Sequence, residues 1–424
     1  MNLYKSAALC LWLCLVHVQA SAYTQNTLNN YNNNAVDSLE QIYETQAIAD
    51  NVWSELTNEF VNLYEAGNYA QASAVAKQTY DIALANFGKQ HINTADSMLK
   101  VGIINETLGN YEVAEQHMTE AKKILVKQLG PYHEDVAIVL TNLANLYFEQ
   151  NRPELSEINH KKALQIRIHT LGENDPAVAQ SMYNLAVLYD DLTKYEQAAE
   201  LYESALEIWN ASYGVAHPYV ANALNNLANV YMVMERYEDA IELHKHSLSV
   251  RRSLYGDNHA EVARSLINLG ALYVKQGAYD KAEPLYVEAV HVAENLFGPQ
   301  HPQVAMLLYS LANIYHIQGR LAKAESQHLL KDSVAKTSAH ATQAMETTKV
   351  SAKLPGQTKL EKSAQTKFKK AVPLYERALK ILDTSMGGEH PAVTAMINEL
   401  AMLYKSIGDT TNAQKMQARL SSIH

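Results

Sequence analysis

Histidines recur in this chain where a metal site would be the first hypothesis, because imidazole is the commonest metal ligand. His133, His217, His259, His301 and His390 stand at matching places, in several cases directly before a proline. Asp175 takes the same place before Pro176. Successive copies in an extended array would also lie too far apart to share one ion. A residue that Asp can replace just before the first turn of a helix is predicted to be an N-cap, and no metal site is predicted.

The remaining candidates for chemistry have simpler explanations. His160, His244 and His328 fall where Tyr202 and Tyr286 fall, so they are predicted to be side chains at the edge of a helix layer. Glu196, Glu238 and Glu283 are expected on solvated helix faces. The sequence contains no Gly-rich phosphate loop, no HExxH and no GxSxG. We therefore predict no catalytic residue and no cofactor.

Asparagines form the one repeated polar pattern that suggests binding. One helical position reads Asn142, Asn184, Asn226, Asn268 and then Ser310, and the position three residues later reads Asn145, Val187, Asn229, Ala271 and Asn313. Asn is a mediocre helix former, so its repetition needs a reason. Each amide offers an acceptor and two donors, which can bind the backbone of an extended peptide. The alternative is that these amides bond neighbouring helices or are simply inherited with the repeat.

The candidate peptide-binding set combines these amides with groove-facing neighbours. It comprises Asn142, Asn145, Tyr183, Asn184, Asn225, Asn226, Asn229, Arg264, Asn268, Tyr309 and Asn313. The surface is mixed amide and apolar, and it favours an extended or helical peptide with apolar anchors.

A repeated helical hairpin must position these residues. Residues 217–256 carry apolar or small side chains at Leu224, Leu227, Ala228 and Tyr231, the spacing of one helix face, and a second helix follows until Gly256. The terminating glycines Gly88, Gly130, Gly172, Gly214, Gly256 and Gly298 lie 42 residues apart. Tyr69, Tyr111, Tyr195, Tyr237 and Tyr279 start the second helices at the same step, with Pro153 and Leu321 in the remaining two places. Small residues such as Ala114, Ala198, Ala240 and Ala282 are expected where the two helices approach closely.

This pattern resembles the tetratricopeptide repeat, in the 42-residue form of kinesin light chains. The resemblance rests on LxxLAxxY at Leu224 to Tyr231 and on AxxxYxxA at Ala198 to Ala205. It implies an all-α fold, a right-handed α-solenoid of about eight antiparallel helix pairs whose first helices line a concave groove. Members that hold a terminal carboxylate use lysines on those helices. Here Thr141, Tyr183, Asn225 and Ile267 occupy the key position, which disfavours that ligand.

Composition and the amino terminus bound the remaining choices. A net charge of -10 argues against nucleic acid as a partner. Residues 1–22 are expected to be a signal peptide, with Lys5 before an apolar run and Ala20-Ser21-Ala22 for cleavage. Both cysteines, Cys10 and Cys14, lie inside it. Residues 23–35 are expected to be a flexible Asn-rich linker, and 36–424 the solenoid.

The seventh pair is interrupted by 47 extra residues, near 325–371, with nine Lys against four Asp and Glu. A protruding helical hairpin, a disordered loop and a decayed repeat all fit this stretch.

These observations predict an exported, non-catalytic scaffold that binds a protein or an extended peptide. It would be periplasmic in a bacterium and secreted otherwise, with no nucleic acid or small-molecule substrate, and with membrane contact only through an uncleaved signal. The alternatives are a regulatory or assembly subunit of an enzyme complex, and a cytosolic cargo adaptor like kinesin light chain if the amino terminus is not a signal.

Overall fold

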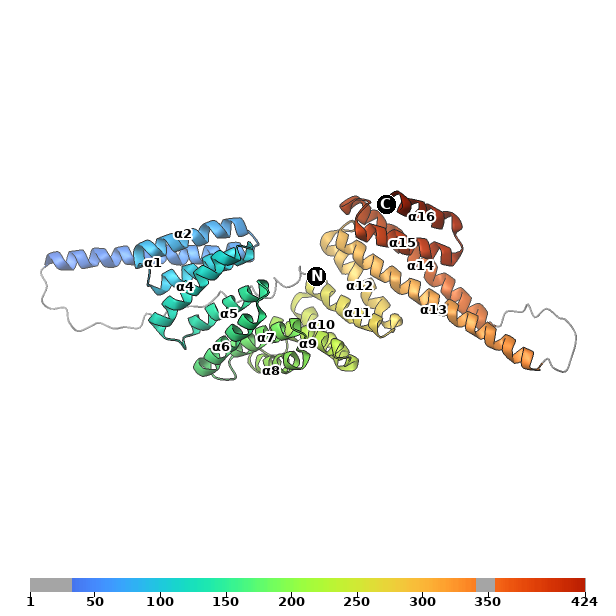
Figure 1. Cartoon of the computed structure of the whole chain (residues 1–424), viewed down its shortest axis with the longest axis horizontal. Coiled ribbons are helices and arrows are strands. Elements are labelled where there is room, and N and C mark those ends of the chain that lie inside the picture. The colour runs from blue at the N-terminus through green and yellow to red at the C-terminus, as the bar shows by residue number, and fades with distance from the viewer. Residues whose placement is uncertain (1–32, 341–354, 424) are drawn as a thin grey trace. The chain divides into compact units, whose positions relative to one another are not determined.

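A computed structural model describes residues 33–340 and 355–423 of the chain. The expected signal peptide and most of the expected linker lie outside these residues. The described residues form helices and no strands, in two compact units that divide between Ile208 and Trp209. The prediction of an all-α fold is confirmed (Figure 1).

Helices alternate in length along the chain. The first helices of the pairs are α1 (Asn33–Glu65), α3 (Ile92–Thr107), α5 (Glu134–Glu149), α7 (Pro176–Asp191), α9 (Pro218–Val233), α11 (Ala260–Lys275), α13 (Pro302–His340) and α15 (Pro391–Ile407). The second helices are α2 (Tyr69–Phe87), α4 (Tyr111–Leu129), α6 (Pro153–Leu171), α8 (Tyr195–Tyr213), α10 (Tyr237–Tyr255), α12 (Tyr279–Phe297), α14 (Pro355–Met386) and α16 (Thr410–Ile423). The expected eight pairs are therefore all present.

Glycines end the second helices as the 42-residue period predicts. Gly256, for example, follows α10 with φ of 74°, and its N–H bonds the Arg252 carbonyl. A left-handed residue also stands in the turn inside seven of the pairs. Gly67, Gly109, Gly277 and Gly408 supply it in four of them, while Asn151, Thr193 and Glu235 adopt φ of 57° to 61° in the other three. The strain of a left-handed side chain is thus concentrated in the central pairs.

Small residues let the helices of a pair approach, as predicted. Ala114, Ala198, Ala240 and Ala282 are all 0% exposed. In the second unit a continuous core of buried residues runs from Leu248 to Ala413. In the first unit one core cluster spans Ala95 to Ile166.

A tyrosine, a glutamate and a cation join successive pairs in a repeated clamp. Tyr147 Oη donates to Glu115 Oε1 at 3.1 Å, and Arg152 Nη1 lies 2.8 Å from Glu115 Oε2. The same arrangement recurs in Tyr189, Glu157 and Lys194, and again in Tyr315, Glu283 and Lys367. The sequence placed Glu283 on a solvated helix face. In the structure, its carboxylate is instead bonded to Tyr315 and Lys367.

The clamp also favours the ionised form of the Glu283 carboxyl. Burial alone would raise the pKa of this carboxyl, but hydrogen bonds from Lys367 and Tyr315 outweigh it and lower the pKa to about 2.

The interruption of the seventh pair is a helical arm. α13 continues through Gly319 without a turn, and α14 begins long before the place where a second helix normally starts (Figure 1). We call residues 320–340 and 355–366 the arm. Its two helices pack together where Ser326, 2% exposed, donates to the Gln357 carbonyl at 3.5 Å. Of the three expected forms, the hairpin is the one found in the described residues.

The register of the insertion differs from the expectation at both ends. Phe368 is 0% exposed and packs where the tyrosine stands in other pairs, whereas Leu321 is 55% exposed. Ala371, not Ala324, fills the close-approach position. A Cβ at Gly319 would lie 2.5 Å from Phe368, so glycine is needed there for close contact. The extra residues are therefore 320–366 and not 325–371.

Candidate functional site

The predicted histidine caps set where the first helices begin, and so where the asparagine row lies. In α5, α9 and α11 the cap histidine accepts through Nδ1 from the N–H two residues on, at 3.2 Å each. Asp175 accepts from Ala177 N–H at 2.8 Å in α7. His301 and His390 cap in the same way, and so does His91, which the sequence reading missed. The capping role of these residues is confirmed.

Aromatic rings hold several of these caps in place. His217 stacks on Tyr213 with ring centroids 4.4 Å apart, and His259 stacks on Tyr255 at the same distance. Burial lowers the pKa of His217, which favours the neutral form that can accept a hydrogen bond.

The other predicted histidine positions are not at a layer edge. His160 is 4% exposed and His244 is 1% exposed, so both are core residues. His328 is exposed on the arm and does not share their place, which Tyr375 takes at 0% exposure. The 47 extra residues move the matching repeat position from His328 to Tyr375.

The asparagine row (Asn142, Asn184, Asn226 and Asn268) occupies the same repeat position in α5 and α7 of the first unit and in α9 and α11 of the second. All four side chains are half-buried. In the second unit, Asn268 Nδ2 donates to Asn225 Oδ1 at 2.7 Å, and Asn225 Nδ2 donates to Asn226 Oδ1 at 3.3 Å. The bond from Asn268 to Asn225 joins the first helices of two successive pairs, α11 and α9.

Asn225 supports this surface from beneath. It is 5% exposed, and both bonds described above leave its amide satisfied inside the protein. Asn229, one turn further along α9, is half-buried and makes no hydrogen bond to the described residues. The amide of Asn229 is therefore available to a ligand in this unit.

Arg264 lies beside the row in a network of charged and polar side chains. Its guanidinium is paired with Glu261, and its Nη2 donates to Asn222 Oδ1 at 3.2 Å. The buried Arg251 donates to the same Asn222 oxygen at 2.9 Å and lies 3.2 Å from Glu261. Two guanidinium groups thus share the one carboxylate of Glu261, and the network holds Arg264 in place.

Two further predicted residues lie on α13 and contact the second helix of their own pair. Tyr309 packs edge-on against Tyr375 with ring centroids 5.7 Å apart. Asn313 accepts the hydroxyl of Tyr375. On the same helix Met306 is 48% exposed and adds an apolar side chain to the surface.

The first unit carries the start of the row. Asn142 Nδ2 bonds the Ile138 carbonyl of its own helix at 2.9 Å, and Asn184 accepts from Gln180 at 2.9 Å. Asn145 is half-buried and forms no hydrogen bond within the described part. Tyr183 is 6% exposed and packs on Tyr202, which leaves little of its ring for a ligand.

Asn222 was missed in the sequence because its place in the repeat carries no constant residue. The matching positions are Ile138, Gln180 and Arg264, so no pattern marks it. The burial of Asn225 was equally hidden, since its counterparts are Thr141, Tyr183 and Ile267. In both cases the contact partner, and not the repeat position, decides the role.

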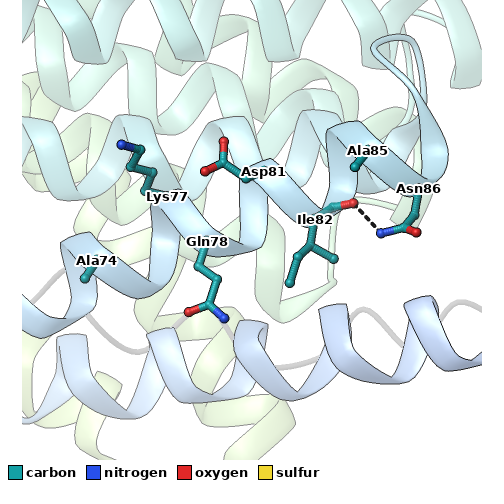
Figure 2. Close-up of a pocket in the computed structure, with 7 residues that line it drawn as sticks. All are labelled: Ala74, Lys77, Gln78, Asp81, Ile82, Ala85 and Asn86. Carbon is teal, nitrogen blue, oxygen red and sulfur yellow. Dashed lines mark hydrogen bonds between the residues drawn. The ribbon is translucent and has the colours of Figure 1, made fainter.

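A separate hollow of about 440 Å³ lies on α2, away from the row (Figure 2). Its lining residues are Ala74, Lys77, Gln78, Asp81, Ile82, Ala85 and Asn86. They form a single helix stripe, so the hollow has one wall and cannot enclose a small molecule. Asn86 is already bonded to the Ile82 carbonyl at 2.9 Å.

The row offers neutral amides, which suit hydrogen bonding to a peptide and not proton transfer. Within residues 33–340 and 355–423, no group of three or more His, Cys, Asp or Glu could hold a metal ion. In the same residues, no helix is both long and apolar enough to cross a membrane.

Comparison with known proteins is consistent with these observations. The family model described as tetratricopeptide repeat matches residues 61–125, 107–168, 135–211, 219–294 and 271–329, and a second model of that description matches 183–245. No protein of curated function matches the sequence.

Several solved structures are similar. BtubC (BKLC) from P. vanneervenii has 23% identity over 55% of this chain and 91% of its own, with a TM-score of 0.47. A putative kinesin light chain of Podosopora anserina has 19% identity over 49% and 98%, with a TM-score of 0.45. The STAND protein PH0952 of Pyrococcus horikoshii, which has a tetratricopeptide repeat sensor, has 14% identity over 87% and 49%, with a TM-score of 0.55. At these identities the likeness concerns the fold alone, and the chain spans about half of the last protein.

Proposed function

Since the chain belongs to the tetratricopeptide repeat family, whose model matches more than half of it, we propose that it binds an extended peptide segment of a partner protein along its first helices. Tetratricopeptide scaffolds are suited to protein–protein interaction and are generally non-catalytic. The observation that carries the proposal is the amide surface of Asn226 and Asn268, which the buried Asn225 supports by hydrogen bonds, with Asn229 left without a hydrogen bond to the described residues.

The spacing of the row within the second unit suits an extended chain. Packed helices lie about 8–10 Å apart, and an extended peptide advances about 3.3 Å per residue. Asn226 and Asn268 would therefore meet peptide residues that are about three apart. Because amides bond the peptide backbone, recognition at these points does not depend on the peptide's side chains.

Specificity is expected from apolar anchors next to the row. Met306 is largely exposed and Ile267 is half-buried on the neighbouring first helix. Arg264 and Arg251 share the single carboxylate of Glu261, so the cluster keeps a net positive charge beside the row. The partner segment should carry long aliphatic or Met side chains next to the row.

A triple variant tests this surface. Asn184→Ala, Asn226→Ala and Asn268→Ala are introduced together, and partners are recovered from host extract with the variant and with the wild type. We expect loss of the partner and, once its peptide is identified, an affinity at least about tenfold weaker, since each lost hydrogen bond contributes about 1 kcal/mol. Unchanged recovery with unchanged helicity by circular dichroism would eliminate the proposal.

Two controls separate ligand binding from helix packing. Asn229→Ala removes no hydrogen bond within the described residues, so it should weaken binding without lowering the melting temperature. Asn86→Ala on α2 removes an exposed amide outside the row and should leave binding unchanged.

We also propose that the protein is exported, on the basis of its amino-terminal sequence. Amino-terminal sequencing of the protein from its host should find a chain that begins after Ala22 or nearby. An intact Met1 on a cytosolic protein would favour the cargo-adaptor alternative.

A further inference from the structure

The charge of this chain is divided sharply along its length. Residues 1–319 hold 19 Lys and Arg against 36 Asp and Glu, whereas residues 320–424 hold 16 against 9. The first part therefore carries a net charge of -17 and the second a net charge of +7. An acidic composition overall conceals a strongly basic carboxyl-terminal region.

In the second unit, part of this basic charge forms a stripe on α14. Lys359, Lys362, Lys369 and Lys380 are exposed and make no ion pair with any described residue. At 100° per residue they fall within about 80° of the helix circumference, and Thr366 and Pro373 fill the gaps between them. We call these four residues the lysine stripe. Their neighbours Lys367 and Arg377 are engaged instead with Glu283 and Glu294.

In the first unit, the complementary charge lies on α8. Glu196, Glu200, Glu203 and Glu207 are exposed at i, i+4, i+7 and i+11, within about 60° of that helix's circumference. α8 contains no Lys or Arg, unlike the other second helices. We call these four residues the glutamate stripe. It is about 16 Å long, and the part of the lysine stripe from Lys359 to Lys369 is about 15 Å long.

We propose that the lysine stripe of one copy docks on the glutamate stripe of a second copy, in a head-to-tail self-association. Lysines in an exposed row with no ion pair repel one another, and this repulsion is relieved by an opposing row of carboxylates. Two different surfaces meet in such a contact, so each copy keeps one stripe free and further copies can add. The association should be weak and salt-sensitive, because exposed ion pairs are screened.

A second copy is favoured over an anionic membrane as the occupant. Both complementary stripes belong to this chain, and the glutamate stripe is about as long as the part of the lysine stripe from Lys359 to Lys369. The net charge of -17 on residues 1–319 would also oppose an approach to anionic lipid.

Reciprocal charge reversal in the full chain tests the proposal. One variant carries Lys359→Glu, Lys362→Glu and Lys369→Glu, and the other carries Glu196→Lys, Glu200→Lys and Glu207→Lys. Sedimentation velocity over a concentration series, at low and high ionic strength, reports the weight-average mass. The wild type should associate with rising concentration at low salt and be a monomer at high salt, and each variant alone should associate at least about tenfold more weakly.

Mixing distinguishes specific docking from a change in net charge. The two variants together should regain association, and the chain that carries all six substitutions should associate with itself as the wild type does. A control with Lys77→Glu, Lys162→Glu and Lys281→Glu changes the net charge equally and should associate like the wild type. Circular dichroism melting confirms that each variant is folded.

Three outcomes would overturn the proposal. The first is a wild type that stays monomeric at every concentration at low salt. The second is a lysine-stripe variant that associates as well as the wild type. The third is a monomeric wild type that cosediments with vesicles of anionic phospholipid through the lysine stripe, which would assign that stripe to lipid.

Discussion

Single residues that repeat every 42 positions in this chain do not always perform one role. The cap positions do, because His133, His217 and His259 each accept from the N–H two residues further along the chain. Asp175 accepts the equivalent bond through its carboxylate. The cap can form only with neutral histidine, since Nδ1 must accept. The position of His160 and His244 is occupied by Tyr in other pairs. Both histidines are core residues because they are buried there.

These two buried histidines should make stability depend on pH. Burial, together with the charge of a nearby arginine, lowers the pKa of His160 and of His244 to about 4, against an ordinary value near 6.5. The unfolded chain therefore binds more protons below about pH 6.5, and stability falls as the pH is lowered from there toward 4. The expected loss at about pH 5 is about 2 kcal/mol for each histidine.

The substitution His244→Tyr tests this, because Tyr202 and Tyr286 fill the matching places. Urea unfolding at several pH values should show a smaller loss of stability in acid for the variant than for the wild type. His246→Gln, two residues away and exposed, should leave the pH dependence unchanged. An unaltered slope in His244→Tyr would contradict the assignment.

The left-handed turn at Thr193 should be a second source of instability. Thr193 has φ of 58°, a conformation that a β-branched residue seldom adopts, while Gly277 adopts 72° at the matching place. We expect Thr193→Gly to raise the free energy of unfolding by about 1 kcal/mol. The control variant Gln197→Gly, inside α8, should lower the free energy of unfolding by a similar amount. Chemical denaturation of both variants measures the two changes.

At the scale of elements, much of the fold could be predicted from the sequence. The starts and ends of the helices followed from histidine, proline and glycine at a constant period, because caps and left-handed turns are local requirements. The arm was harder to predict from the sequence. Leu321 to Ala324 and Phe368 to Ala371 both have the spacing that a second helix requires, and only packing against Gly319 distinguishes them.

The candidate site was predictable only in outline. The repeat placed the asparagines on one face, but the hydrogen bond between Asn268 and Asn225 depends on how two helices pack. The position of Arg264 likewise depends on Glu261 on its own helix and on Asn222 one pair away. Sequence periodicity identifies equivalent positions and does not report which side chains find internal partners.

Removing the arm should restore an ordinary helix pair. Deletion of residues 320–366 brings Gly319 next to Lys367, so that Gly319 can form the left-handed turn and Lys367 can still reach Glu283. We expect a folded protein with a single cooperative melting transition. A deletion two residues longer, 320–368, also removes Phe368, which is fully buried, and should destabilise by about 3–5 kcal/mol. Thermal melting followed by circular dichroism measures both, and equal stability of the two deletions would contradict the register.

At the scale of the whole molecule, the extensive contacts of the described helices join elements that are neighbours in the chain. Stability in such an array is a sum of local contributions. A substitution at a central Asn or Leu position is therefore expected to change the stability of its own helix pair and of the adjacent pairs, and not that of the whole array.

A core substitution should show this locality. Leu143→Ala in α5, at a side chain that is 0% exposed, should cost about 2–5 kcal/mol. Hydrogen exchange should show lost protection in α4 to α7 and little change in α11 to α15. A uniform loss of protection in both units would contradict local stabilisation and indicate one cooperative unit.

The junction of the arm suggests that this segment is portable. Its two ends leave and re-enter the repeat at Gly319 and Lys367, the places that Gly277 and Ala278 occupy one pair earlier. A chain with residues 320–366 moved to follow Gly277 would meet Tyr279 in the position of Phe368. The arm is thus a graftable module, and any pair whose inner turn contains glycine is a candidate host for it.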